Sequence, residues 1–117
     1  MKILITDDSA FMRTVVKNAL KDINADFYEA ENGDVAVDLF KEYKPEIVLL
    51  DIIMPVKNGV MALQEIKELE PKTIVILVTS VGQDEMVEKA KELGANDFVP
   101  KPFQPAQLQE VVQKYIK

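Results

Sequence analysis

The sequence predicts an α/β fold in which a parallel five-stranded sheet is covered by helices on both faces. Short apolar runs alternate five times with segments whose apolar residues recur at helical spacing. The runs around Val48 and Ile76 are apolar throughout, which is typical of parallel strands buried on both faces. The chain has 117 residues and shows no repeat, low-complexity stretch or linker, so residues 1–117 are expected to form a single domain.

The apolar runs place the five expected strands at residues 3–5, 27–28, 47–50, 74–78 and 98–99. Apolar faces at helical spacing within residues 11–23, 35–43, 60–69, 86–93 and 108–115 mark the five expected helices. Pro105 suits the start of the last helix, where a missing N–H is tolerated, and Gly94 suits a left-handed cap after the fourth helix. Right-handed crossovers between the parallel strands leave few topologies. We adopt the usual order of small doubly wound sheets, 2-1-3-4-5, which the sequence alone does not determine.

The composition excludes several classes of function. The chain has no Cys and no His, which rules out a thiol nucleophile, a Ser-His-Asp triad, a Cys/His zinc site and a phosphohistidine carrier. A net charge of -6 argues against nucleic acid as a direct partner. No apolar run approaches the ~20 residues that span a bilayer, and residues 1–6 lack a signal peptide's long apolar segment. We therefore expect a cytoplasmic protein with no membrane partner.

Polar residues fall at the carboxyl ends of the expected strands. Asp7 and Asp8 follow the first strand, Asp51 follows the third, Thr79 ends the fourth, and Lys101 lies just past the fifth. Ligands of open α/β sheets bind beyond the carboxyl ends of the strands, where the strand order reverses. In the adopted order the first and third strands are neighbours, about 4.8 Å apart. Asp8 and Asp51 should then face each other across a crevice, with Thr79 and Lys101 on its far side.

Three carboxylates gathered in this way repel one another, and unless they are neutralised at least one must take up a proton. A hard divalent cation resolves the conflict, and a partly hydrated, all-oxygen site suits Mg²⁺. Lys101 adds a positive charge that can meet a phosphoryl oxygen, and Thr79 adds a hydroxyl donor. Together these residues are the parts needed for phosphoryl transfer to a carboxylate.

A simpler interpretation treats each of these residues alone. Asp8 or Ser9 would then cap a helix, Asp51 would belong to turn chemistry, and Thr79 and Lys101 would be ordinary loop residues. For any single residue this interpretation is the better one. Turns do not explain why all of them fall at the carboxyl ends of different strands, so the joint pattern favours a site.

In order and spacing these residues resemble the signature of the response-regulator receiver domain, and the resemblance covers the whole chain. The matching segments are Asp7-Asp8, Asp51-Ile52-Ile53-Met54-Pro55-Val56-Lys57-Asn58-Gly59, Thr79-Ser80 and Lys101-Pro102-Phe103. Stand-alone chemotaxis regulators are the most similar members. The resemblance implies a flavodoxin-like (βα)5 fold with three αβα layers. It also implies a role in two-component signal transduction, with a histidine kinase as one partner.

The resemblance assigns a role to each residue of the cluster. Asp51 would accept the phosphoryl group, and Lys101 would contact it. Mg²⁺ would be held by Asp8, Asp51 and the backbone carbonyl of Ile53, with Asp7 helping through water. The chain would not be an enzyme in the ordinary sense, because it would catalyse only its own phosphorylation and dephosphorylation.

A switch is also implied. Thr79 would move to bond a phosphoryl oxygen, and Phe98 would turn inward to fill the vacated space. The face built from the fourth helix, the fifth strand and the fifth helix would then change shape for a partner such as a flagellar-motor switch component. The protein is expected to be a monomer, and the bond between Lys101 and Pro102 is expected to be cis.

Two departures from the family pattern bear on how fast the switch operates. Ile53 and Val81, two residues beyond Asp51 and Thr79, are apolar at positions that border the path of the hydrolytic water. We therefore expect slow self-dephosphorylation. Phe98 replaces a Tyr found in many chemotaxis relatives, and on sequence alone it is equally well explained as a plain core aromatic.

Other functions stay open at this stage. A haloacid-dehalogenase-type phosphatase also uses a strand-end Asp with Mg²⁺, but it needs a second Asp where this chain has Ile53. A purely structural interaction module, a phosphorelay intermediate and a receiver cut from a larger regulator are further alternatives. The basic residues Arg13, Lys17 and Lys21 recur at helical spacing and are most simply a solvated face, although a partner could use them.

Overall fold

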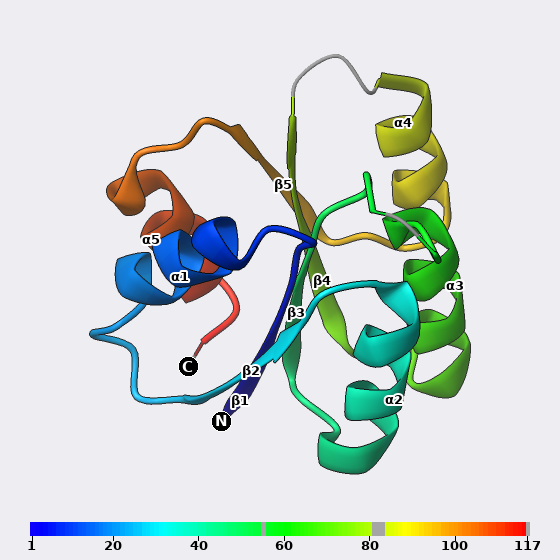
Figure 1. The fold of residues 1–117 in the computed structure, drawn as a ribbon, viewed down its shortest axis with the longest axis horizontal. Coiled ribbons are helices and arrows are strands. Elements are labelled where there is room, and N and C mark those ends of the chain that lie inside the picture. The colour runs from blue at the N-terminus through cyan, green and yellow to red at the C-terminus, as the bar shows by residue number, and fades with distance from the viewer. Residues whose placement is uncertain (55, 81–83, 117) are drawn as a thin grey trace.

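The structure is a computed structural model that describes residues 1–54, 56–80 and 84–116. Five strands form its sheet: β1 (Lys2–Thr6), β2 (Asp26–Ala30), β3 (Ile47–Leu50), β4 (Ile74–Ser80) and β5 (Asp97–Lys101). Five helices follow them in alternation: α1 (Ala10–Ala19), α2 (Gly33–Tyr43), α3 (Gly59–Leu69), α4 (Asp84–Glu92) and α5 (Pro105–Gln113). The expected α/β alternation is confirmed (Figure 1).

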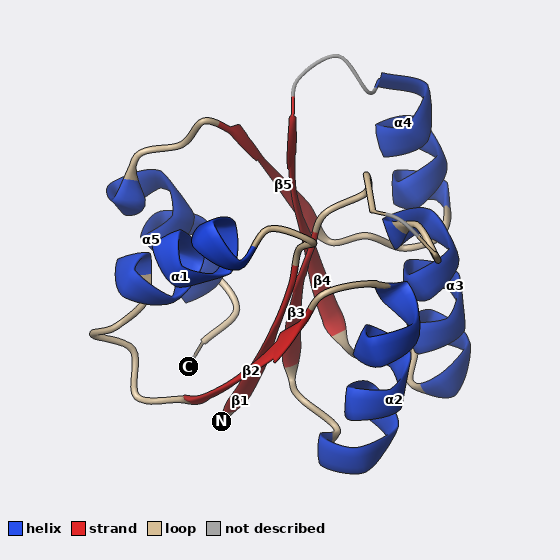
Figure 2. Cartoon of the chain, in the orientation of Figure 1, coloured by secondary structure: helices blue, strands red, loops and turns tan. Residues whose placement is uncertain are grey.

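All strand pairs are parallel, and the sheet has the order β2-β1-β3-β4-β5. This confirms the adopted order 2-1-3-4-5. Helices α1 and α5 cover one face of the sheet, while α2, α3 and α4 cover the other (Figure 2). The chain therefore has the three-layer αβα architecture, with the first and third strands as neighbours at the centre.

Alternation along the strands divides the core into two layers. Ile3 and Ile5 of β1 pack with α1 and α5, whereas Leu4 packs with α2, α3 and α4. Every residue of β3 is buried, which explains why its sequence is apolar throughout. The larger core, on the α2–α3–α4 face, includes Phe40 and Leu63.

Side-chain caps set the starts of three helices. Ser9, Asn32 and Asn58 each accept a hydrogen bond from the backbone N–H three residues later, at the starts of α1, α2 and α3. Pro105 is the first residue of α5, and Gly94 after α4 has a φ of 103°, both as expected. No helix in the described part of the chain is long and apolar enough to cross a bilayer.

Two helices end earlier than the apolar spacing predicts. The first ends at Ala19, and Ile23 reaches the core from the following turn, where its N–H donates to the carbonyl of Leu20 (3.0 Å). The last helix ends at Gln113, beyond which Tyr115 still packs against the core. Apolar spacing cannot distinguish a helical residue from a turn residue that points the same way.

Tyr115 also belongs to a polar cluster that fastens the end of the chain to β5. Its hydroxyl donates to Asp97 Oδ2 (3.0 Å), which also receives Lys114 Nζ (3.4 Å). The N–H of Phe98 donates to Asp97 Oδ1 (2.9 Å). Burial alone would raise the pKa of Asp97, but these hydrogen bonds outweigh it and hold the pKa below its ordinary value.

Candidate functional site

The sheet brings the strand-end polar residues together at one edge. The N–H of Asp7 donates to the carbonyl of Ala30 (3.1 Å), and the N–H of Asp51 donates to the carbonyl of Thr6 (3.0 Å). These bonds continue the strand pairing by one residue, so both carboxylates lie directly beyond their strands. Thr79 lies in β4, and Lys101 is the last residue of β5.

The carboxylate of Asp51 is almost fully buried and accepts three hydrogen bonds. The side chain is 8 % exposed. Its Oδ1 accepts the Thr79 hydroxyl (2.9 Å) and the N–H of Ile53 (3.1 Å). Its Oδ2 accepts Lys101 Nζ at 2.9 Å. The carboxylate is therefore fixed in one orientation beyond the carboxyl end of β3.

Lys101 neutralises part of the acidic cluster. Its ammonium group donates to Asp7 Oδ2 (2.6 Å) as well as to Asp51 Oδ2 (2.9 Å). Burial alone would lower the pKa of Lys101, but the bonds to Asp7 and Asp51 raise it above its ordinary value. A shared lysine therefore relieves part of the repulsion among the carboxylates, in addition to the proton or metal ion expected from the sequence.

The acidic cluster has the donor chemistry of a site for a hard cation. Asp7, Asp8 and Asp51 each offer a carboxylate oxygen, and these oxygens lie within 4.8 Å of one another. Asp8 is exposed, whereas Asp7 is 4 % exposed and its Oδ1 accepts the N–H of Ser9 (2.9 Å). The carbonyl of Ile53 receives no hydrogen bond from any residue that the structure describes. An all-oxygen set of this kind fits Mg²⁺.

The loop after β3 is fastened from several sides. Gly59 passes so close to the backbone of Asp51 that an added Cβ would collide with the Asp51 carbonyl oxygen, and its N–H donates to the carbonyl of Ile52 (2.9 Å). Lys57 Nζ bridges Glu65 (2.6 Å) and Asp34 (3.1 Å). The hydrogen bond to Glu65 is the main cause of the raised pKa of Lys57. This brace joins the loop to both α2 and α3.

Arg13 is a residue of the site that the sequence argument misplaced. Its side chain is 16 % exposed, and it donates to the backbone carbonyl of Asp7 (2.7 Å) and to Glu29 Oε1 (3.0 Å). Lys17 also pairs with Glu29 (2.9 Å). The expectation of a solvated face is therefore wrong for Arg13, which supports the backbone behind the acidic pair. No feature of the sequence pattern separates it from Lys17 and Lys21.

The comparisons with known proteins agree with this arrangement. The sequence model of the response regulator receiver domain matches residues 3–113. The chain belongs to the receiver domain family. It is 45 % identical to the chemotaxis protein CheY of Listeria monocytogenes over 118 aligned positions, which cover 100 % of this chain and 99 % of the relative. The CheY of Thermotoga maritima is 42 % identical over 99 % of this chain and 98 % of its own.

Solved structures agree as well. The crystal structure of the receiver domain of NtrX from Brucella abortus superposes with a TM-score of 0.90 at 30 % identity, covering 97 % of each chain. The receiver domain described here is thus a component of a two-component system, a signalling protein rather than a classical enzyme. Receiver domains bind Mg²⁺ at an acidic pocket and work with histidine kinases and downstream target proteins.

The two residues that the resemblance assigned to a switch occupy different environments in this receiver domain. Thr79 is fully buried, and its hydroxyl already bonds Asp51, so it needs no further approach to reach that carboxylate. Phe98 is half-buried and packs against the core on the α2–α3–α4 face. The Lys101–Pro102 bond is cis, as expected. Ile53 is 49 % exposed, whereas Val81 lies outside the described residues.

Proposed function

We propose that this receiver domain is a phosphorylation-controlled switch in which Asp51 accepts a phosphoryl group from a histidine kinase. The observation that carries the proposal is the fixed, buried Asp51 carboxylate, which shares Lys101 with Asp7 at the carboxyl edge of the sheet. A carboxylate used only for structure would not need two further carboxylates beside it, since these oppose its charge.

In the proposed reaction an oxygen of Asp51 attacks phosphorus and the P–N bond to the kinase imidazole breaks. An acyl phosphate forms, and the imidazole nitrogen leaves with the bonding electron pair. Lys101 Nζ can bond an oxygen of the transferred group while it still contacts the carboxylates. Thr79 supplies a second donor on the opposite carboxylate oxygen. Both donors are in place before the group arrives, so little reorganisation is required.

Asp8, Asp51 and the Ile53 carbonyl are the groups that would hold Mg²⁺ in this proposal, with Asp7 acting through water. Bound Mg²⁺ supplies charge neutralisation for the phosphoryl oxygens. Asp8 is suited to this role because it is exposed and none of its neighbours in the described chain pairs with it. Asp7 is held by Lys101 and by the N–H of Ser9, which suits a less direct contact.

For the output we propose that the new charge is read through β4 and β5. Thr79 and Lys101 lie on these two strands, and Phe98 lies three residues before Lys101. A phosphoryl group that accepts hydrogen bonds from both Thr79 and Lys101 changes the surroundings of Phe98. The shape of the α4–β5–α5 face, which the partner binds, changes as a result. The similarity to chemotaxis proteins supports a flagellar-motor switch component as that partner.

The first experiment measures intact-protein mass after incubation with acetyl phosphate, with and without Mg²⁺. We expect one Mg²⁺-dependent phosphoryl adduct on the wild type and none on Asp51→Asn. Asp38→Asn is the matched control, because Asp38 is an exposed carboxylate on α2 and far in sequence from the cluster. An adduct that persists in Asp51→Asn would refute the assignment of the acceptor. Absence of any adduct on the wild type would favour an interaction module that is never phosphorylated.

The phosphatase alternative finds no support in the site. The position two residues beyond Asp51 is occupied by Ile53, which offers no acid to protonate a leaving group. Multiple turnovers on a small phosphate ester such as p-nitrophenyl phosphate would be needed to restore that alternative.

A further inference from the structure

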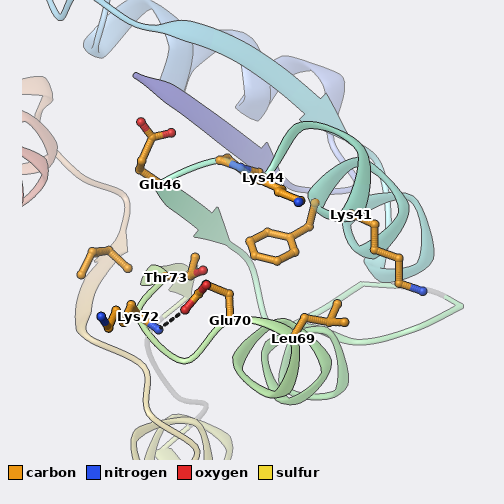
Figure 3. A pocket seen from close by; sticks show the side chains of 10 residues that line it. Lys41, Lys44, Glu46, Leu69, Glu70, Lys72 and Thr73 are labelled. Carbon is orange, nitrogen blue, oxygen red and sulfur yellow. Dashed lines mark hydrogen bonds between the residues drawn. The ribbon is translucent and has the colours of Figure 1, made fainter.

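A pocket lies at the edge of the sheet opposite to Asp51. It has a volume of about 530 Å³ and is lined by residues that precede β3 and β4 and by the ends of α2 and α3. Lys44 and Glu46 lie on one wall, and Leu69, Glu70 and Thr73 lie on the other (Figure 3). Because β3 and β4 are parallel and the Asp51 site follows their carboxyl ends, the two sites are separated by the length of the sheet.

The interior of the pocket is apolar apart from one hydroxyl. Phe40 and Pro45 are buried, and Ile74 is half-buried. Thr73 is only 4 % exposed, yet its hydroxyl makes no hydrogen bond with any described residue. Its backbone is fully used, since its N–H donates to the Glu70 carbonyl (3.1 Å) and its own carbonyl accepts Lys67 Nζ (2.6 Å). Among the described residues only the Thr6 hydroxyl is fully enclosed without a partner, so the Thr73 hydroxyl keeps some access to the pocket and can donate a hydrogen bond to a ligand there.

The rim carries charge of both signs, with three lysines and two glutamates, and neither Glu46 nor Glu70 forms an ion pair with a described residue. Glu46 and Glu70 each accept a backbone N–H (3.2 Å in both cases), which fixes their carboxylates. Within the described chain, the ammonium groups of Lys41, Lys44 and Lys72 have no carboxylate within 4.0 Å. The chain as a whole has a net charge of -6, so three unpaired lysines around one apolar pocket run against its overall balance.

From this combination we propose that the pocket binds a small organic anion with an apolar body and a single carboxylate. The apolar body lies on Phe40 and Ile74, and the carboxylate accepts the Thr73 hydroxyl and pairs with the lysines of the rim. The volume falls within the range of about 300–1,000 Å³ that small-molecule sites occupy. The anion satisfies the Thr73 hydroxyl and the unpaired ammonium groups together, which a neutral ligand or a cation does not. The proposal does not depend on phosphorylation of Asp51.

The test is a titration followed in two-dimensional amide NMR spectra of isotope-labelled protein. Phenylacetate is the probe, and phenylacetamide is its neutral counterpart of nearly the same shape. We expect saturable shifts at Lys44, Leu69 and residues 72–74, with phenylacetate binding about tenfold more tightly than the amide. Equal binding of the two compounds, shifts confined to other parts of the sheet, or no saturable shift would overturn the proposal.

Variants test which side chains contribute to phenylacetate binding. Thr73→Val keeps the shape of the side chain, and Lys44→Met keeps most of its length, and each is expected to weaken phenylacetate binding about fivefold or more. Lys21→Met is the matched control, because Lys21 is an exposed lysine in the turn after α1 and does not line the pocket. Asp51→Asn is expected to bind as the wild type does. Weakening by Lys21→Met or Asp51→Asn equal to that by Lys44→Met would refute the assignment.

Discussion

The same substitution at two buried threonines should change stability in opposite directions. Thr6, at the end of β1, is 2 % exposed. Among the residues that the structure describes, its hydroxyl is the one buried side-chain polar group without a hydrogen-bond partner. Its register neighbours are Ala30 on β2 and Leu50 on β3, which are both apolar. Thr79 is equally buried, but its hydroxyl donates to Asp51 at 2.9 Å.

The expected magnitudes follow from these surroundings. A buried hydroxyl without a partner costs about 1–3 kcal/mol, and Val has nearly the same shape as Thr. Thr6→Val should therefore raise the free energy of unfolding by about 1–2 kcal/mol. Thr79→Val removes a hydrogen bond to a charged group and should lower it by about 1.5–2 kcal/mol. The two variants should thus melt about 10–16 °C apart, at roughly 4 °C per kcal/mol for a domain of this size.

The assay is urea unfolding followed by circular dichroism, with thermal melting as a second measurement. The slope of the unfolding free energy against urea should be the same for both variants, since neither changes the surface exposed on unfolding. Destabilisation by Thr6→Val would refute the reasoning, because it would mean that the Thr6 hydroxyl has a partner. Stabilisation by Thr79→Val would show that its bond to Asp51 does not offset the cost of burying the hydroxyl.

Four further predictions concern other parts of the molecule. The pKa of Asp97 is lower in the folded state than in the unfolded state. Its ionised carboxylate therefore stabilises the fold at pH values above the unfolded-state pKa of about 3.9, and this stabilisation is lost as the pH falls through the folded-state pKa. Asp97→Asn should therefore reduce the unfolding free energy by about 1 kcal/mol at neutral pH and by almost nothing near pH 2, as urea titrations at the two pH values would show. Val56 is a β-branched residue with a φ of 71°, so Val56→Gly should stabilise by about 0.5–1 kcal/mol in the same assay, and destabilisation would argue against this strain. Arg13→Met should weaken Mg²⁺ binding measured by calorimetry, whereas Lys17→Met, which loses only the Glu29 pair, should not. Ile53→Asn should shorten the lifetime of the phosphorylated form in a mass time course, and an unchanged lifetime would count against the role given to this apolar side chain.

Most of the fold was predictable because its signals are local. The apolar runs at β3 and β4 and the helical periodicity between strands reflect burial, which a sequence records directly. The second strand gave the weakest signal, since only Phe27 and Tyr28 marked it and the structure extends it over Asp26–Ala30. It is an edge strand that pairs only with β1, so fewer of its residues need to be apolar.

The gathering of Asp7, Asp51, Thr79 and Lys101 was predictable for a similar reason. The carboxyl ends of parallel strands meet at one edge, so position along the strands was enough. The partners of these side chains were not predictable. Whether the Lys101 ammonium pairs with Asp7, with Asp51 or with both depends on a few ångströms of strand twist and stagger. The support from Arg13 depends on the direction in which the chain turns between β1 and α1, and spacing along a helix carries no information about either.

The contacts of Lys101 and Thr79 restrict how the site can communicate with the rest of the molecule. Both residues lie at the same end of the paired strands β4 and β5, where Thr79 is opposite Pro100 and Ser80 is opposite Lys101. Each already donates to a different oxygen of Asp51. In the proposed mechanism, a phosphoryl group on Asp51 adds a third acceptor for the Lys101 ammonium, beside Asp51 and Asp7. Lys101 is the last residue of β5, so a change in its contacts acts on the end of the strand that also carries Phe98. The coupling to the α4–β5–α5 face therefore requires no relay of side chains through the core, because the donors that read the charge belong to the strands that must respond.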